Sequence, residues 1–227
     1  MATTSLRHQD QDGLNVETRK FTIVFFGDSS VGKTSLILRF LGYGFSDEYQ
    51  PTIEDFFIKH VFYNNKTCEL QLIDTTGTYE FPAMRKVDIL KADAFVLVYT
   101  PNNPVSFKKL SRYRSEILEE GKDKCPCIVV CNKSDLGRDV QQPILRDHRG
   151  MQVSVQHLVE NQWRCHWMDC SAKENYNVEL IFYRLLDDIC KLYQTETPLR
   201  KISSLLQLRK KSVSKQSLAS LDHENTR

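Results

Sequence analysis

One stretch of the chain, Gly27-Asp28-Ser29-Ser30-Val31-Gly32-Lys33-Thr34, constrains its fold more than any other. The stretch matches G-x-x-x-x-G-K-[ST], the phosphate-binding P-loop. A mostly apolar run precedes it at 21–26, and apolar residues follow at helical spacing over 36–41. We therefore expect a loop between a buried strand and a helix N-terminus, where backbone N–H groups and the helix dipole attract an anion. A chance match on a glycine-containing turn is the alternative, and the flanking strand and helix weaken it.

The P-loop pattern predicts the groups that bind a nucleoside triphosphate. Lys33 reaches the β- and γ-phosphates, and the Thr34 hydroxyl ligates Mg²⁺. The pattern leaves open which base is bound and whether the triphosphate is cleaved. The residues that we expect around the phosphates are Gly27, Asp28, Ser29, Ser30, Val31, Gly32, Lys33, Thr34 and Ser35.

The overall composition is that of an ordinary globular protein. The chain has 227 residues, of which 41% are hydrophobic and 26% are charged. A net charge of +2 gives no reason to expect a nucleic-acid partner. The seven cysteines lack zinc or thioredoxin spacing, so we expect reduced, mostly buried thiols in a cytoplasmic protein. A signal peptide is not evident, and no apolar run approaches the ~18 residues of a membrane span.

Apolar strands alternate with helical segments along most of the chain. Because strands that are apolar throughout are buried on both sides, they favour a mostly parallel sheet with helices on both faces. We expect an α/β, three-layer P-loop fold with a six-stranded sheet, one antiparallel edge strand and about five helices. The expected strands are 20–26, 56–63, 66–73, 94–99, 127–131 and 165–170, with Asn64-Asn65 as a hairpin turn. The expected helices are 33–41, one within 78–91, 104–119, a short one near 155–161 and a final one from about 178.

Three segments are expected: a mobile N-terminal arm at 1–19, one folded domain at 20–195, and a basic, Ser-rich, disordered tail at 196–227. The tail holds seven Lys or Arg and three acidic residues. Each Lys or Arg near an anionic leaflet contributes about 1 kcal/mol, so we expect weak, salt-sensitive attraction to the plasma membrane. A solvated end or a nuclear-import signal is an equal alternative.

Asp74-Thr75-Thr76-Gly77 follows a predicted strand and has the form of a metal-coupled acid. Asp74 would hold Mg²⁺, commonly through a water molecule, as a Walker-B acid does. The Gly77 N–H could then meet the γ-phosphate. An Asp-x-x-Gly turn is the alternative, because Asp and Gly are common turn residues.

Asn132-Lys133-Ser134-Asp135 follows another predicted strand and indicates the base. A carboxylate at Asp135 can accept two hydrogen bonds from the N1–H and N2–H₂ edge of guanine, a donor pair that adenine lacks. A site built for hydrogen bonds rejects the analogue without them by ~10⁴ or more. Asn132 would brace the loop, and the Lys133 stem would cover the base. A solvated turn is the alternative for this motif alone.

Five motifs together resemble those of a Ras-family small GTPase. They are the P-loop, 49–55, 74–77, 132–135 and Ser171-Ala172-Lys173, in the order of that family and near its spacing. The resemblance extends over about 20–194, so the folded domain at 20–195 is similar to a G domain. Phe81-Pro82-Ala83-Met84 is similar to the Di-Ras and dexamethasone-induced Ras branches.

The resemblance implies further roles. Phe45 would pack edge-on against guanine, and the Ala172 N–H would donate to guanine O6, with Ser171 and Lys173 beside it. Thr52 would ligate Mg²⁺ only when the γ-phosphate is present. An ordinary core aromatic is the alternative for Phe45. The residues implied in catalysis are Lys33, Thr52, Gly77 and Thr78; those implied as metal ligands are Thr34, Thr52 and Asp74.

The resemblance also implies protein partners: a guanine-nucleotide exchange factor, a GTPase-activating protein, and effectors that contact switch I. A solvated acidic pair is the alternative for Glu54-Asp55. The residues implied in effector contacts are Tyr49, Pro51, Ile53, Glu54 and Asp55.

The chain departs from the family pattern at four places. Thr78 stands where most relatives have the Gln that orients the attacking water. Ser29 and Ser30 stand where Ras has glycines, close to where an arginine finger would enter. The stretch 136–164 is long, and its structure is hard to assign. The chain ends without a Cys-a-a-X box, so we expect no prenylation.

These features together predict a GTP-binding switch in signal transduction that uses Mg²⁺ and hydrolyses GTP slowly. A GTP-binding scaffold with negligible hydrolysis, regulated by its abundance or by partner binding, is the alternative. A P-loop kinase for a small molecule is disfavoured, because nothing resembles an acceptor site or a lid.

Overall fold

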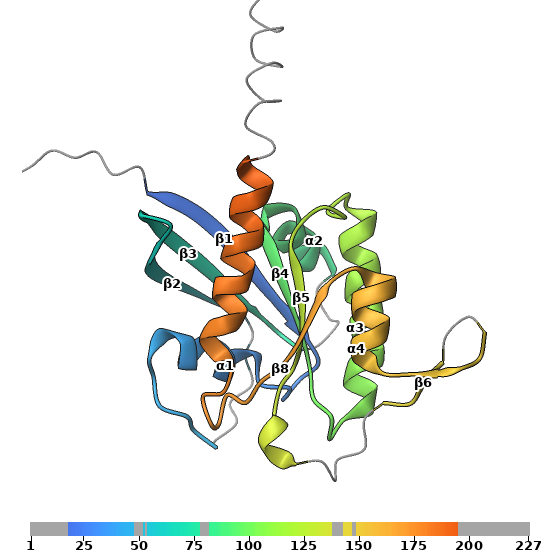
Figure 1. Cartoon of the computed structure of the whole chain (residues 1–227). Coiled ribbons are helices and arrows are strands. Elements are labelled where there is room, and N and C mark those ends of the chain that lie inside the picture. The colour runs from blue at the N-terminus through green and yellow to red at the C-terminus, as the bar shows by residue number, and fades with distance from the viewer. Residues whose placement is uncertain are drawn as a thin grey trace, which may run out of the picture.

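A six-stranded sheet forms the centre of the molecule (Figure 1). From edge to edge its strands are β2 (Glu54–Tyr63), β3 (Lys66–Thr75), β1 (Arg19–Gly27), β4 (Ala94–Tyr99), β5 (Cys127–Cys131) and β8 (His166–Asp169). β2 pairs antiparallel with β3, and all the other neighbours in this sheet pair in parallel. The structure is a computed structural model that describes residues 18–47, 52, 54–77, 82–137, 143–146 and 149–194. The predicted α/β fold with one antiparallel edge strand is confirmed.

Helices cover both faces of the sheet (Figure 1). They are α1 (Lys33–Leu41), α2 (Pro82–Lys91), α3 (Pro104–Glu119), α4 (Val155–Leu158) and a last helix over 178–194. A π-helical turn, η2 (Val159–Trp163), continues α4, and a 3-10 turn, η1 (Ser134–Leu136), follows β5. The predicted helices are all present, and their bounds agree closely with those expected.

The alternation of side chains along β1 explains why both faces need cover. Ile23 and Phe25 point to the face on which α1 and helix 178–194 pack. Val24 and Phe26 point to the opposite face, against residues of α2, α3 and α4. Each face therefore buries its own apolar cluster, and the sheet stands between the two.

Two local features refine the expectations. Asn64 and Asn65 have φ of 49° and 59°, so the hairpin between β2 and β3 turns where the sequence indicated. The stretch that was hard to assign contains a small hairpin, β6 (Leu145–Arg146) with β7 (Gln152–Val153).

The expected arm lies outside the described residues except at 18–19, and the expected tail lies wholly outside them. Within the described ranges, no helix has the length and apolar character to cross a membrane.

A substitution at Phe182, on helix 178–194, tests how much the apolar cluster between the sheet and α1 contributes to stability. Phe182 is fully buried. The centroid of its ring lies 5.8 Å from that of Phe25, and its ring stacks on Phe40. Phe182→Ala is expected to lower the free energy of unfolding by about 3–5 kcal/mol, because it removes a large buried ring and leaves a cavity. Urea unfolding measures this loss. Tyr183→Ala, at the next position, is the control: Tyr183 is 39% exposed, and a comparable loss there would contradict the assignment.

Candidate nucleotide-binding site

The polar motifs meet at one edge of the sheet. The P-loop follows β1, Asp74 lies near the end of β3, Asn132 follows β5, and Ser171 comes shortly after β8. These four strands run in the same direction, so their carboxyl ends form a single edge. In open α/β sheets this edge is where ligands bind.

Lys33 lies buried at the start of α1, in the curl of the P-loop. Its ammonium donates to the backbone carbonyls of Gly27 and Asp28, at 3.1 and 3.0 Å. Burial lowers the pKa of Lys33 to about 8, although the nearby Asp74 and Asp28 carboxylates act to raise it. The loop thus holds a poorly solvated cation, which an anionic ligand would stabilise.

A cluster of oxygen atoms lies beside the P-loop. The Thr34 hydroxyl is 2.9 Å from the Thr52 hydroxyl and donates to Asp74 Oδ2 at 2.5 Å. Asp74 is fully buried, and no donor among the described residues reaches its Oδ1. Burial raises the pKa of Asp74, while the Thr34 hydrogen bond and the Lys33 charge act to lower it.

This oxygen cluster fits a small hard cation such as Mg²⁺. Mg²⁺ prefers oxygen ligands and is usually bound through one or two carboxylates together with substrate phosphates and water. Asp74 supplies a buried carboxylate with one oxygen that no described donor reaches, and Thr34 and Thr52 supply hydroxyls next to it.

Gly77 touches the backbone of the P-loop. A Cβ atom placed on Gly77 would lie 2.1 Å from Ser29 N and 2.4 Å from Ser29 Cα. Real Cβ contacts do not come this close, so a larger residue would push the loop after β3 away from the P-loop. The segment that follows Asp74 is therefore in direct contact with the P-loop backbone.

Asn132 ties three loops together. Its Nδ2 donates to Val31 O in the P-loop at 2.9 Å, and its Oδ1 accepts the Ala172 N–H at 3.1 Å. The Cys170 thiol also donates to this Oδ1, at 3.6 Å. Only 1% of Asn132 is exposed, so these bonds are shielded from water.

Asp135 and Ser171 are also joined. The Ser171 hydroxyl donates to Asp135 Oδ1 at 2.6 Å and accepts the Glu174 N–H at 3.0 Å. Asp135 is exposed, and Lys133 before it has a φ of 66°, which turns the loop sharply at the end of β5. Phe45 is 36% exposed, so it is not an ordinary core aromatic.

One contact of the P-loop was not predicted from the sequence. Lys109, on α3, forms a 2.7 Å ion pair with Asp28 of the P-loop. Asp28 is 5% exposed, and its Oδ1 also accepts the Ser29 N–H. No local pattern marks Lys109, because its partner lies on a different segment and only the packing of α3 brings the two together.

Several predicted residues lie outside the described part of the chain. Asp55 is described: it is exposed and lies opposite Asp74 in the pairing of β2 with β3. The side chain of Glu54 is outside the description. The remaining residues that lie outside it are Tyr49, Pro51, Ile53 and Thr78.

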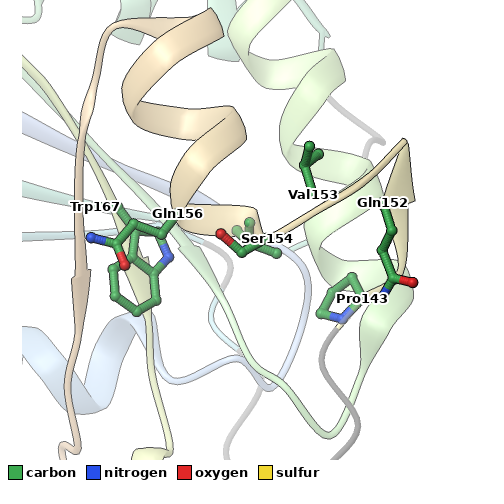
Figure 2. Close-up of a pocket in the computed structure, with 7 residues that line it drawn as sticks. Pro143, Gln152, Val153, Ser154, Gln156 and Trp167 are labelled. Atoms are coloured by element: carbon green, nitrogen blue, oxygen red, sulfur yellow. The ribbon is translucent and has the colours of Figure 1, made fainter. Parts of the chain in front are cut away.

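A cavity of about 570 Å³ lies elsewhere, by the small hairpin and α4. Figure 2 shows Trp167 of β8 toward one side of it and Pro143 and Gln152 toward the other. Among the described residues, none that belongs to the five motifs lines this cavity. The described residues that line it include no cationic side chain, so they offer little to a phosphate.

Comparison with known proteins identifies the family. The sequence of residues 22–191 matches that of the Ras family. The chain belongs to the Ras family. Human GTP-binding protein Di-Ras1 is 37% identical over 172 residues, which are 75% of this chain and 82% of the relative. Human GTP-binding protein Rhes is 36% identical over 194 residues, which are 81% of this chain and 70% of the relative. The resemblance to Ras-family proteins, including the Di-Ras branch, is thus confirmed.

Gly32 tests the link between the P-loop and Asn132. Gly32 has a φ of 94°, and a Cβ there would lie 2.3 Å from Asn132 Nδ2. Gly42, at the other end of α1, has a similar φ of 99°, but no atom of the described residues lies within 4 Å of a Cβ placed there. Both Gly→Ala changes incur backbone strain of about 1–2 kcal/mol.

Gly32→Ala is therefore expected to lower the free energy of unfolding by about 1–3 kcal/mol more than Gly42→Ala does, because it also disrupts a buried hydrogen bond. Urea unfolding of the two variants measures the difference. Equal losses would show that Asn132 does not restrain the loop.

Proposed function

We propose that this Ras-family protein is a guanine-nucleotide switch that binds GTP and GDP with Mg²⁺ and slowly hydrolyses GTP to GDP and phosphate. One observation supports this most: the phosphate loop, the oxygen cluster and the loop bearing Asp135 meet at one sheet edge, and Asn132 joins the first to the last. Relatives that match most of the chain are named GTP-binding proteins.

The phosphates would bind at the P-loop. Lys33 brings a buried positive charge to the loop, and the start of α1 directs backbone N–H groups toward the same point. Thr34, Thr52 and Asp74 would hold Mg²⁺, which neutralises charge on the β- and γ-phosphates. Gly77, in contact with Ser29, places its backbone beside the same loop.

The base would bind at the loop after β5. Asp135 is exposed, and Ser171 fixes the orientation of its carboxylate through Oδ1. Ala172, on the neighbouring loop, donates its N–H to Asn132, which places that backbone next to the loop after β5. Phe45, with a third of its surface exposed, would supply the aromatic edge.

Asp135→Asn tests the choice of base. The substitution removes a carboxylate matched to two donors of guanine, so GTP affinity is expected to fall on the order of 10²-fold or more. Xanthosine nucleotides, which present an acceptor in place of the amine, are expected to bind the variant better. Fluorescent-nucleotide titration measures both affinities. Asp123→Asn, an exposed acid elsewhere, is the control, and unchanged GTP affinity in Asp135→Asn would remove the base-site assignment.

Switching would involve the segments that bear Thr52 and Gly77. Both touch the phosphate-binding elements, Thr52 through the Thr34 hydroxyl and Gly77 through the P-loop backbone. Binding of the γ-phosphate would order these segments, and its loss would release them. Effectors would then bind Tyr49, Pro51, Ile53, Glu54 and Asp55, and an exchange factor and an activating protein would act on the same region.

We place the protein in the cytoplasm. The basic residues after Glu196 would add weak, salt-sensitive attraction to anionic membranes. The G domain itself would extend over 20–195. Transfer of a signal would then depend on partner proteins that recognise the switch segments.

Thr78 determines the proposed slow rate. Ras, which has Gln at this position, hydrolyses GTP at only about 3–5 × 10⁻⁴ s⁻¹ without an activating protein. The Thr hydroxyl lies close to the backbone and cannot span the attacking water and the γ-phosphate. We expect wild-type hydrolysis below the Ras rate and faster hydrolysis in Thr78→Gln, as measured by single-turnover assay of preloaded protein.

Thr78→Ala is the matched control, since it removes the hydroxyl without adding an amide and is expected to hydrolyse GTP as slowly as wild type. A wild-type rate at or above the Ras value would show that another residue positions the water. A rate that Thr78→Gln fails to raise, together with tight GTP binding, would favour the alternative of a GTP-binding scaffold.

A further inference from the structure

Three of the seven cysteines line one cavity, far from the P-loop. Cys125, Cys127 and Cys165 border a cavity of about 690 Å³ between α3, the end of η2 and helix 178–194. All three are half-buried, whereas the other four cysteines are buried. Cys127 is the first residue of β5, and Cys165 comes just before β8. The cavity therefore lies at the amino ends of these strands, opposite the nucleotide edge of the sheet.

Cys127 and Cys165 are neighbours across two strands. β5 and β8 pair in parallel, with Ile128 opposite His166, so the preceding residues occupy adjacent positions. The two thiols interact closely enough to shift each other's pKa in opposite directions. Neighbouring strands lie about 4.7–4.9 Å apart, within the Cα separations of about 4.4–6.8 Å that disulfides span. The spacing of the two strands is therefore compatible with a disulfide between these positions.

The surroundings make the two thiols unequal. Arg114 of α3 donates to the Trp163 carbonyl at 3.4 Å, and the Cys165 thiol donates to that same carbonyl at 3.5 Å. The hydrogen bond from Cys127 and the charge of Arg114 lower the pKa of Cys165, whereas the pKa of Cys127 is raised. When Cys165 loses its proton, the Cys127 and Arg114 donors stabilise the thiolate, so Cys165 is the better nucleophile of the pair.

A metal site does not explain the cluster. Across the described residues, no group of three His, Cys, Asp or Glu side chains is placed to hold a metal ion. His166 also borders the cavity, but its Nε2 pairs with Asp188 at 2.8 Å. The arrangement is therefore that of two thiols side by side, one activated and the other placed to react next.

We propose that Cys165 and Cys127 form a covalent modification site for hydroperoxides, which ends in a reversible disulfide between β5 and β8. The Cys165 thiolate attacks the peroxide: an S–O bond forms, the O–O bond breaks, and the leaving oxygen takes a proton as water or an alcohol. The Cys127 sulfur then attacks the sulfenic acid: an S–S bond forms, the S–O bond breaks, and water leaves. The two thiols lose two electrons in all, which reduce the peroxide, and a thiol reductant restores the pair.

The experiment treats full-length wild-type protein with hydrogen peroxide, blocks remaining thiols with N-ethylmaleimide and maps the digested peptides by mass spectrometry. The expected product is a Cys127–Cys165 linked peptide that lacks two hydrogen atoms, appears before Cys68, Cys131, Cys170 or Cys190 is oxidised, and disappears with dithiothreitol. This measurement needs no variant. A linked peptide formed only after unfolding in urea, or oxidation spread evenly over all cysteines, would overturn the proposal.

Variants separate the two steps. Cys127→Ser is expected to leave a sulfenic acid at Cys165 that dimedone captures. Cys165→Ser is expected to slow the first thiol oxidation by about tenfold or more, since each unit of thiol pKa changes the thiolate fraction up to about tenfold. Cys125→Ser, in the same cavity, is the matched control and is expected to keep the Cys127–Cys165 link. An unchanged oxidation rate in Cys165→Ser would show that another thiol reacts first.

Discussion

The hydrogen bonds of the Asn132 side chain are the constraint on which the site depends. The amide donates to Val31 in the P-loop and accepts from Ala172 after β8, and both bonds lie in the protein interior. A loop has few internal restraints of its own, so its shape depends on contacts with its neighbours. Asn132 supplies such contacts for two loops at once, and the close approach of Gly32 is what lets its amide reach the P-loop.

Charge balance in the P-loop is the second constraint. Asp28 puts a carboxylate into a loop whose backbone is suited to anions. This carboxylate and a phosphate in the same loop would repel each other strongly, because the site is poorly solvated. Lys109 pairs with that carboxylate at 2.7 Å, and the Ser29 N–H donates to the same oxygen. We infer that α3 neutralises Asp28, which leaves the charge of Lys33 available to a phosphate.

The sheet could be predicted from sequence because its signals are local. Apolar runs such as 94–99 indicate strands that are buried on both sides, and Asn64-Asn65 indicates the turn of the hairpin between β2 and β3. The placement of the motifs at strand ends followed from the same pattern. The partners of individual side chains could not be predicted: Lys109 meets Asp28 across 81 positions of sequence, and Cys127 meets Cys165 only through the pairing of β5 with β8. The hairpin of β6 and β7 was also missed, because its strands are too short to show a period of two.

The two chemical sites share strands without sharing residues. Asn132 follows the last residue of β5 and Cys127 is the first, so about 16 Å of extended chain separates them. At the nucleotide end the β5 and β8 loops are already joined, since Ser134 N donates to Cys170 O and Cys170 N to Cys131 O. A disulfide at the far end would restrain strands that are already paired, so it would oppose their separation more than it would change the loop that bears Asp135. Oxidation of the thiol pair would therefore act on the stability of this part of the sheet, while the geometry of the loop that bears Asp135 would continue to depend on Asn132 and Ser171.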